Sequence, residues 1–222
     1  MAHIKEEYLS DALPFWSALT NSQRENIIAG SRSERFKKDS LIYGGIGDLG
    51  VVIVRHGRLC VYTVSQEGRE FVIMRLFGGS ICMLGSETVM GRSAHITNIS
   101  AESEVDLIII NSAVYDEICM MNRRAEFFTR TVINDHMAAI VANVQNMLLV
   151  SVERRVANFI LEEHERSGSS RIKVTHEQLA KYIGTAREVV SRTLKKLTAD
   201  GVISAERGFV VIKDPTALIK LI

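Results

Sequence analysis

Apolar residues recur at different spacings along the chain, and each spacing predicts its own kind of secondary-structure element. Residues 41–110 carry short apolar runs rich in Val, Ile, Tyr and Phe, a composition typical of strands. The runs are LIY, VVIV, RLCVYTV, EFVIMRLF, SICML, HITNISA and VDLIII. Gly57, Gly68 and the pair Gly78-Gly79 fall between runs, where a jelly roll or barrel places its hairpin turns. The first half therefore predicts an antiparallel roll of about eight strands.

Apolar residues return at helical spacing on both sides of this roll. Leu13, Trp16 and Leu19 predict a short amphipathic start. Residues 123–150 predict a helix of about 28 residues, which is about 42 Å long at roughly 1.5 Å per residue. Its broad apolar face is made of Ile133, Met137, Ile140, Val141, Val144, Met147 and Leu148, and a second face of Val132, Ala139 and Ala142.

A helix that is apolar on more than one side must be covered from more than one side. The roll can cover one face of residues 123–150, and the same helix of a second chain is the natural cover for the other. We therefore expect a homodimer. Asp135, His136 and Asn143 interrupt the pattern, and burial of the helix in one large core of a single chain is the alternative.

The pattern of apolar and polar residues changes again in the last third of the chain. It predicts a helix (VERRVANFILEEHE), a turn (RSGSS), two further helices and two short strands, GVIS and GFVVI, joined at Arg207-Gly208. Helices followed by a small hairpin form a winged helix-turn-helix module. We expect three parts: a roll in residues 1–122, the long helix in residues 123–150 and the winged module in residues 151–222.

The segment EQLAKYIGTAREVVSRTLKKL, residues 177–197, carries the helix-turn-helix signal. Gly184 stands at the turn, where a positive φ is least costly without a Cβ. On the second helix, Val190, Leu194 and Leu197 face the core. The side chains that this arrangement turns outward or to the flank are Arg187, Glu188, Ser191 and Arg192.

A helix of this size fits the major groove of DNA. There an arginine can make two hydrogen bonds to guanine, a glutamate can accept one from the cytosine amino group, and a serine is permissive. Thr175, His176 and Thr185 lie at helix starts, where they can hold phosphates. Helix capping is the alternative role of these three residues, and Thr185 and Glu188 have the spacing of a capping box.

The net charge of +1 hides an asymmetry between the two parts of the chain. Residues 1–150 hold 14 Lys and Arg against 17 Asp and Glu, whereas residues 151–222 hold 13 against 9. The excess lies between Arg171 and Lys196, with seven basic and two acidic residues. Clustered positive charge favours a polyanionic partner such as double-stranded DNA, and a solvated helix face is the alternative.

Other features bear on location and chemistry. No apolar run reaches the roughly 18 residues that cross a bilayer, and the start carries acidic residues where a secretory signal needs an apolar stretch. We therefore expect a cytoplasmic protein without membrane contact. Cys60, Cys82 and Cys119 lack paired metal-ligand spacing, which favours buried structural thiols. An enzyme is not expected, because the sequence has no nucleophile elbow, HExxH motif or phosphate-binding glycine loop.

The segments RHGRLCVY, SQEGRE, FGGS, GRSA, VERRVANFIL and AREVVSR together resemble the Crp/Fnr family of bacterial transcription regulators. The resemblance implies an α+β chain with a cyclic-nucleotide-binding type β jelly roll, a long dimerisation helix and a winged helix-turn-helix domain. It implies partners, namely double-stranded DNA, a second copy of the chain, RNA polymerase and a small effector. It also implies a palindromic operator with TGA in its half-sites, whose base edges are read by Arg187, Glu188, Ser191 and Arg192.

The resemblance does not identify the effector. Members that bind cyclic AMP carry a Gly-Glu pair ahead of an Arg-Ser pair and meet adenine with a Thr-Ser pair on the long helix. Here Arg92 and Ser93 remain, but Met83 and Leu84, and Ile140 and Val141, stand at the other positions. Cyclic AMP is disfavoured because leucine cannot accept a hydrogen bond from ribose, and Arg92 can equally be a surface residue. We expect an unknown, more apolar effector at these six residues, or a constitutive DNA-binding protein whose roll serves only dimerisation.

Two other sensing chemistries of the family can be weighed. An iron-sulfur cluster is not expected, because the first 59 residues contain no cysteine. The stretch Ile81-Cys82-Met83 is similar to haem-binding carbon monoxide sensors, but Leu84 stands where those use a histidine. Cys82 is therefore a candidate redox thiol or soft ligand, with a buried core cysteine as the alternative.

Overall fold

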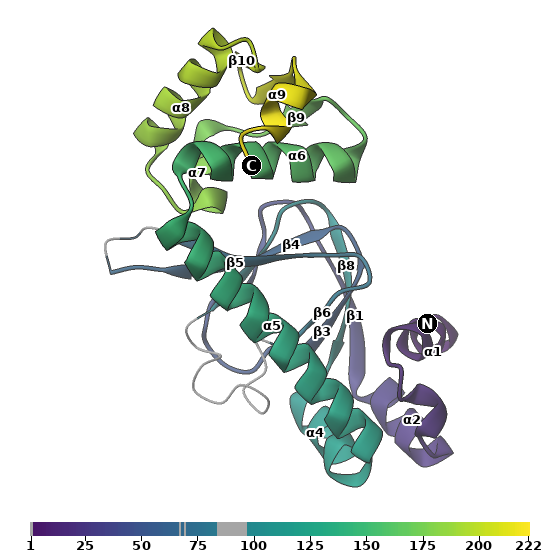
Figure 1. Cartoon of the computed structure of the whole chain (residues 1–222). Coiled ribbons are helices and arrows are strands. Elements are labelled where there is room, and N and C mark those ends of the chain that lie inside the picture. The colour runs from purple at the N-terminus through teal and green to yellow at the C-terminus, as the bar shows by residue number, and fades with distance from the viewer. Residues whose placement is uncertain (1, 67, 69, 84–96) are drawn as a thin grey trace. The chain divides into compact units, whose positions relative to one another are not determined.

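The computed structural model describes residues 2–66, 68, 70–83 and 97–222, and it divides into two compact units (Figure 1). The first unit comprises Met1–Arg69 and Ile73–Ile140, and the second comprises Glu70–Val72 and Val141–Ile222. The long helix α5 (Arg123–Leu149) belongs to both. The expected division at residues 122/123 and 150/151 stays a prediction. No described helix is long and apolar enough to span a bilayer.

Eight strands of the described residues form the predicted antiparallel roll as two four-stranded sheets. One sheet has the order β1-β8-β3-β6 and the other β2-β7-β4-β5. The strands are β1 (Ser31–Phe36), β2 (Leu41–Tyr43), β3 (Val51–His56), β4 (Arg58–Val64), β5 (Glu70–Phe77), β6 (Ile81–Cys82), β7 (Asn98–Ala101) and β8 (Val105–Ile110). The apolar runs of the sequence overlap β2 to β8, whereas β1, with the polar sequence SRSERF, lies outside them.

The turns and the core of the roll follow from its glycines and from alternation along the strands. Gly57 joins β3 to β4 with φ +93°, and a Cβ there would lie 2.2 Å from the carbonyl oxygen of Glu104, so only glycine fits. Gly68 and Gly79 also have positive φ, as the turn prediction requires. Side chains from both sheets meet in one buried cluster, which includes Val54, Leu59, Met74, Ile99 and Leu107.

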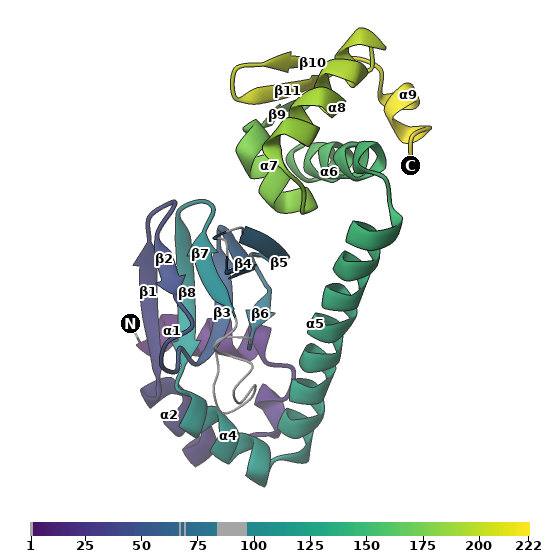
Figure 2. The same cartoon turned by 90° about the vertical axis from the view of Figure 1, so that its left-hand side faces the viewer.

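Helices gather at one end of the roll (Figure 2). They are α1 (Ala2–Ala12), the short 3-10 helix η1 (Trp16–Ala18), α2 (Asn21–Ala29) and α4 (Ser112–Met121). Leu13, Trp16 and Leu19, the predicted amphipathic start, are all buried. They belong to a second cluster that also contains Tyr115 of α4 and Ile108 of β8. Ile108 points to the opposite face of β8 from Leu107 and Ile109 of the first cluster, so these helices cover the outer face of the sheet that contains β8.

Helix α5 presents two adjacent rows of side chains that differ in burial. Ala125 and His136 are buried, and Val132, Ile133 and Ile140 pack against the buried clusters of the roll. The outer row is exposed on the single chain and consists of Phe127 (72%), Met137 (56%), Val141 (47%), Val144 (48%) and Leu148 (77%).

The predicted broad face is therefore only partly covered: Ile133 and Ile140 pack against buried clusters, whereas Met137 and Val141 are exposed. A helix turns by about 100° per residue, and the roll covers only the side that carries Ile140. Burial of the whole helix within one chain is wrong, because the outer row is open to solvent.

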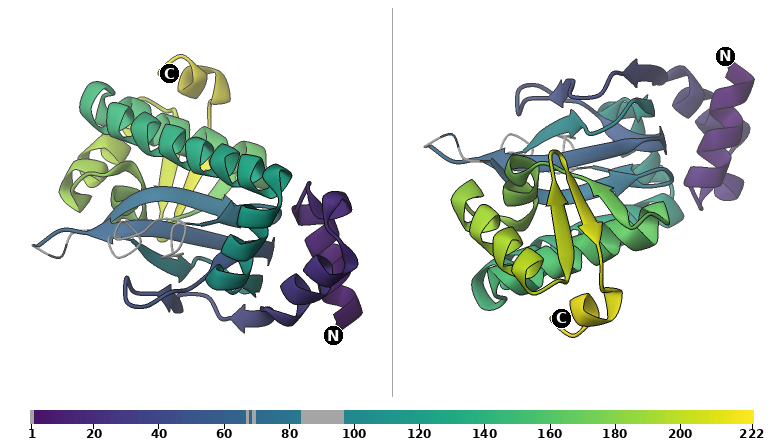
Figure 3. Two further views of the ribbon diagram at one scale, coloured as in Figure 1. Left: turned by 90° about the horizontal axis from the view of Figure 1, so that it is seen from below. Right: turned by 90° about the horizontal axis from the view of Figure 1, so that it is seen from above.

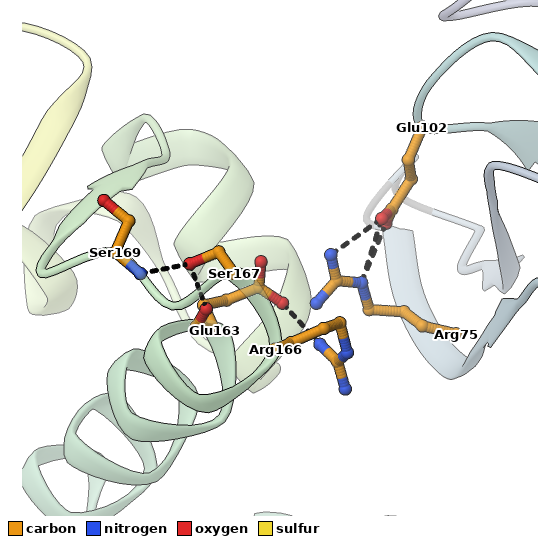
Figure 4. A network of polar contacts seen from close by, with 6 residues as sticks. All are labelled: Arg75, Glu102, Glu163, Arg166, Ser167 and Ser169. Atoms are coloured by element: carbon orange, nitrogen blue, oxygen red, sulfur yellow. Dashed lines mark hydrogen bonds and ion pairs between the residues drawn. The ribbon is translucent and has the colours of Figure 1, made fainter.

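Figure 4 shows polar contacts from each of the two units. In the first unit, Arg75 Nη2 lies 2.8 Å from Glu102 Oε2 in an ion pair of which little is exposed. In the second unit, Glu163 of α6 (Val152–Ser167) accepts a hydrogen bond from Arg166 Nη1 at 2.7 Å. The Ser167 hydroxyl donates to the Glu163 carbonyl oxygen at 2.6 Å.

The second unit contains the predicted winged module. After α6 come β9 (Arg171–Lys173), α7 (His176–Ile183), α8 (Arg187–Ala199), β10 (Ile203–Glu206), β11 (Phe209–Ile212) and α9 (Pro215–Ile219). β10 and β11 form the predicted hairpin, which lies beside α8 (Figure 3), and β9 adds a third strand next to β11. Ile160, Leu179, Leu194 and Val210 belong to the single buried cluster that joins these helices to the sheet.

Candidate nucleic-acid interface

Local chemistry sets the turn between α7 and α8. α7 starts at a capping box, in which the Thr175 hydroxyl accepts from the Gln178 N–H at 3.1 Å and the Gln178 side chain accepts from the Thr175 N–H at 3.0 Å. Gly184 ends α7 in the left-handed conformation, with φ +65° and ψ +51°. α8 then begins at Arg187, so the two helices are joined by a short, defined turn.

Helix α8 is amphipathic in the predicted sense. Val190, Leu194 and Leu197 are at most 1% exposed and pack in the common core of the winged module. Thr193, which stands where an apolar residue is usual, is half-buried. Its hydroxyl donates to the carbonyl oxygen of Val189 at 2.9 Å, one turn earlier, so this hydroxyl is paired although it stands at an apolar position.

Four polar side chains occupy the other side of α8. Arg187, Glu188 and Arg192 are exposed, and Ser191 is half-buried. None of the four side chains has a hydrogen bond or an ion pair within the part of the chain that the structure describes. α8 therefore offers two guanidinium groups, a carboxylate and a hydroxyl to an external partner.

Some other cations of the winged module form ion pairs with acidic neighbours. Lys196 Nζ lies 2.7 Å from Glu153 Oε2, and this hydrogen bond raises the pKa of Lys196. Arg171 Nη2 lies 2.9 Å from Glu206 Oε2. The two arginines on the outer side of α8 differ from these cations, because their charge is not compensated inside the described chain.

The three residues predicted at helix starts have different local roles. Thr175 caps α7, so the capping role is confirmed for it, and His176 is the half-buried first residue of that helix. α8 has Ala186 as its N-cap, without a hydrogen bond from that side chain. The capping box between Thr185 and Glu188 therefore does not form. Contacts of Thr175, His176 and Thr185 with phosphates stay a prediction.

Comparison with known proteins agrees with this geometry. Residues 154–221 match the Crp-like helix-turn-helix domain. The anaerobic regulatory protein of Pasteurella multocida is 24% identical over 215 residues, which cover 90% of this chain and 74% of that protein. The cAMP-activated global transcriptional regulator Vfr of Pseudomonas aeruginosa is 22% identical over 200 residues, which cover 85% of this chain and 92% of that protein. A crystal structure from Eubacterium rectale, of a protein assigned to the Crp/Fnr family of transcriptional regulators, has a TM-score of 0.90 at 29% identity, covering 95% of this chain and 98% of that one.

The protein is a transcription regulator of the Crp/Fnr type. In this Crp/Fnr-type regulator the matched domain begins within α6 and includes α7, the turn, α8 and both strands of the hairpin. The expected fold class is confirmed, and so is the assignment of the chain as a DNA-binding protein.

The residues expected to bind an effector in this Crp/Fnr-type regulator fall in different places. Leu84, Arg92 and Ser93 lie outside the described residues. Met83 is fully buried among apolar side chains. Ile140 packs against the roll, whereas Val141 belongs to the exposed outer row of α5. The described part of the chain thus does not bring Met83, Ile140 and Val141 to one surface, and an effector site there stays a prediction.

The three cysteines of the Crp/Fnr-type regulator form no disulfide within the described residues. Cys60 and Cys82 are buried, as expected for structural thiols. Cys119 is half-buried, with its Sγ 3.3 Å from Thr129 Oγ1, and burial raises the pKa of this thiol. A raised pKa lowers the fraction of reactive thiolate at neutral pH. Among the described residues, no three His, Cys, Asp or Glu side chains gather in a way that could hold a metal ion.

Sequence reasoning missed two residues that contact the helix-turn-helix from α6. Glu153 binds Lys196 of α8, and Arg155 donates to the carbonyl oxygen of Ile183 at the end of α7. These contacts join residues 43 and 28 positions apart, and VERRVANFIL alone has the pattern of an ordinary amphipathic helix. No local signal in the sequence identifies either contact.

Proposed function

We propose that the protein is a homodimeric regulator that binds a palindromic operator through its paired α8 helices. The observation that carries this proposal is the row of unpaired polar side chains on α8. In the major groove, Arg187 and Arg192 can donate to guanine O6 and N7, and Glu188 can accept from the cytosine amino group. Together with Ser191 they favour half-sites with a TGA core, in line with the family resemblance.

The outer row of α5 supports dimerisation. Phe127, Val141 and Leu148 stand at seven-residue steps, with Asn134 completing that line, and exposed Met137 and Val144 have the same spacing. Exposed apolar residues at this interval are the pattern by which two helices pack along their length. A twofold axis between two copies would present two α8 helices to half-sites about 34 Å apart, one turn of DNA.

The test is a titration of labelled duplexes, followed by fluorescence anisotropy at one fixed salt concentration. Wild-type protein is expected to prefer a palindrome with TGA half-sites over a scrambled duplex by on the order of 10³. Glu188→Ala should lose about tenfold of the discrimination at the base pair that it contacts. Glu165→Ala, which removes an exposed acid from α6, is the matched control and should keep the full preference. A Glu188→Ala protein with wild-type preference would remove Glu188 from base reading.

The proposal also includes a small effector that binds in the roll and shifts the DNA-competent population. The Vfr relative is described as cAMP-activated. In this chain Met83 stands where members that bind cyclic AMP carry a glycine, and its side chain is fully buried in an apolar cluster. This favours an effector other than cyclic AMP. Contact with RNA polymerase stays a prediction.

A constitutive regulator is the second candidate, favoured by the same buried Met83. The effector-responsive and the constitutive regulator are distinguished by measuring operator affinity before and after the protein is unfolded and refolded. Unfolding releases any bound small molecule. Saturating cyclic AMP is then added to the refolded protein. Altered affinity after refolding would support an effector-responsive regulator, whereas unchanged affinity in all three states would support a constitutive one.

A further inference from the structure

The carboxyl end of α7 needs hydrogen-bond donors from outside the helix. The N–H groups of Gly184 and Thr185 both reach the carbonyl oxygen of Ala180. The carbonyl oxygen of Ile183, the last residue of α7, accepts instead from Nη1 of Arg155 on α6. A cation at the carboxyl end of a helix makes two favourable interactions. It donates a hydrogen bond to a terminal carbonyl, and its charge interacts with the negative end of the helix dipole.

Arg155 occupies this position at a cost. Burial lowers the pKa of its guanidinium, and no carboxylate among the described residues forms an ion pair with it. Its Nε is buried and has no hydrogen-bond partner within the described chain. A cation desolvated in this way adds little net stability, because the loss of hydration offsets the contact. The hydrogen bond of Arg155 instead has a geometric effect, because it joins α6 to the carbonyl oxygen of Ile183 at the turn.

Gly184, the residue after Ile183, is contacted by a side chain of α5. A Cβ on Gly184 would lie 2.7 Å from Cε and 3.0 Å from Sδ of Met147, so the Met147 side chain lies directly against the glycine. Ile183 is therefore contacted from α6, and Gly184 is contacted from α5. Two residues before Arg155, Glu153 holds Lys196 of α8 at 2.7 Å. The start of α6 thus contacts both helices of the helix-turn-helix.

We propose that Arg155 is a positioning residue for operator binding, and that with Met147 it sets the direction in which α8 leaves the turn. This inference rests on the proposed function, in which α8 reads base edges. Helix α8 has 13 residues. At roughly 1.5 Å per residue it is about 20 Å long, so a tilt of about 10° at the turn moves its far end by about 3 Å. Such a shift exceeds the tolerance of a hydrogen bond to a base, but it leaves general attraction to phosphates unchanged.

The experiment compares full-length Arg155→Met with Arg154→Met, which removes the same charge from an exposed neighbour on α6. Affinity for the TGA palindrome and for a scrambled duplex of equal length is measured at one salt concentration, together with the unfolding temperature. Arg155→Met is expected to lower the ratio of the two affinities by about tenfold relative to Arg154→Met, while affinity for the scrambled duplex stays equal in the two variants. Arg155→Lys, which keeps a donor of positive charge, should recover part of the ratio.

A merely structural role would lower the unfolding temperature of Arg155→Met and leave the affinity ratio of the folded protein equal to that of Arg154→Met. That result would overturn the inference while the proposed function stands. Wild-type protein with no preference between the duplexes would refute the proposed function and this role together. If Arg155→Met does not fold, Met147→Ala carries the test, because removal of the second contact should lower the same ratio about threefold. An unchanged ratio in Met147→Ala would then refute the positioning of α8 from this turn.

Discussion

Nε2 of His136 on α5 lies 3.1 Å from the carbonyl oxygen of Ile81 on β6. The contact requires a hydrogen on Nε2, which leaves Nδ1 of the neutral ring as an acceptor. Nδ1 is buried and has no hydrogen-bond partner within the described chain. A second proton would therefore place a charge and an unpaired donor inside the interface between α5 and the roll.

The stability of the protein is expected to fall in mild acid because of His136. Burial is the main cause that lowers the pKa of this imidazole, against smaller opposing effects of Ile81 and Asp135. The unfolded chain, with an ordinary histidine pKa of about 6.5, then binds more protons than the folded one. The stabilisation is fully present above about pH 6.5 and is lost as the pH falls through the lowered pKa. Unfolding temperatures measured between about pH 8 and about pH 5 report this loss.

His136→Gln keeps an N–H donor but does not titrate, so its unfolding temperature should fall less steeply with acid than that of the wild type. His56→Gln, at an exposed position in the roll, is the control and should follow the wild-type curve. Parallel curves for wild type and His136→Gln would contradict the assignment of the acid sensitivity to His136.

A charge in the outer row of α5 should dissociate the proposed dimer. Val141→Asp places a carboxylate among exposed apolar side chains that a partner helix would cover, and it is expected to weaken dimerisation by about 3 kcal/mol or more. Ala142→Asp adds the same charge at the next residue, about 100° round the helix and outside the row. Light scattering after gel filtration should find Val141→Asp as a monomer and Ala142→Asp as a dimer. Equal behaviour of the two variants would place the interface elsewhere.

Alanine at Gly184 should cost more than backbone strain alone. Both Gly184 (φ +65°) and Gly168 (φ +66°) are left-handed, but of the two only Gly184 has a side chain, that of Met147, within 3 Å of the position that a Cβ would take. The strain should cost about 1 kcal/mol in both alanine variants, and Gly184→Ala should lose about 1 kcal/mol more. Denaturant unfolding measures the difference. Identical losses for Gly184→Ala and Gly168→Ala would mean that Met147 moves aside freely.

Features with a local cause could be predicted from the sequence. Val190, Leu194 and Leu197 are buried where their spacing on one helix places them, and Gly184 has the positive φ that the turn requires. Both depend on residues within the same helix pair, so the pattern alone is sufficient. Helix α4 could have been found in the same way, because Asn111 caps it with hydrogen bonds to the N–H groups of residues 113 and 114.

Features that depend on distant partners could not be predicted. β1 is a strand because it pairs with β8 from Ser31 opposite Ile110 to Phe36 opposite Val105, and its charged side chains suit an exposed sheet edge. The division of α5 into an inner and an outer row depends on which side the roll covers. The contact of Arg155 with Ile183 is likewise invisible in a sequence without knowledge of the helix packing.

The seven-residue step of the outer row on α5 has a geometric consequence. A straight α-helix has 3.6 residues per turn, so a line of side chains repeated every seven residues drifts round the helix axis by about 20° per repeat. From Phe127 to Leu148 the line covers 21 residues, and the drift reaches about 60°. A straight neighbour would touch only part of that line. In the proposed dimer, contact along the full length of the line requires the two α5 helices to coil round each other with a left-handed twist.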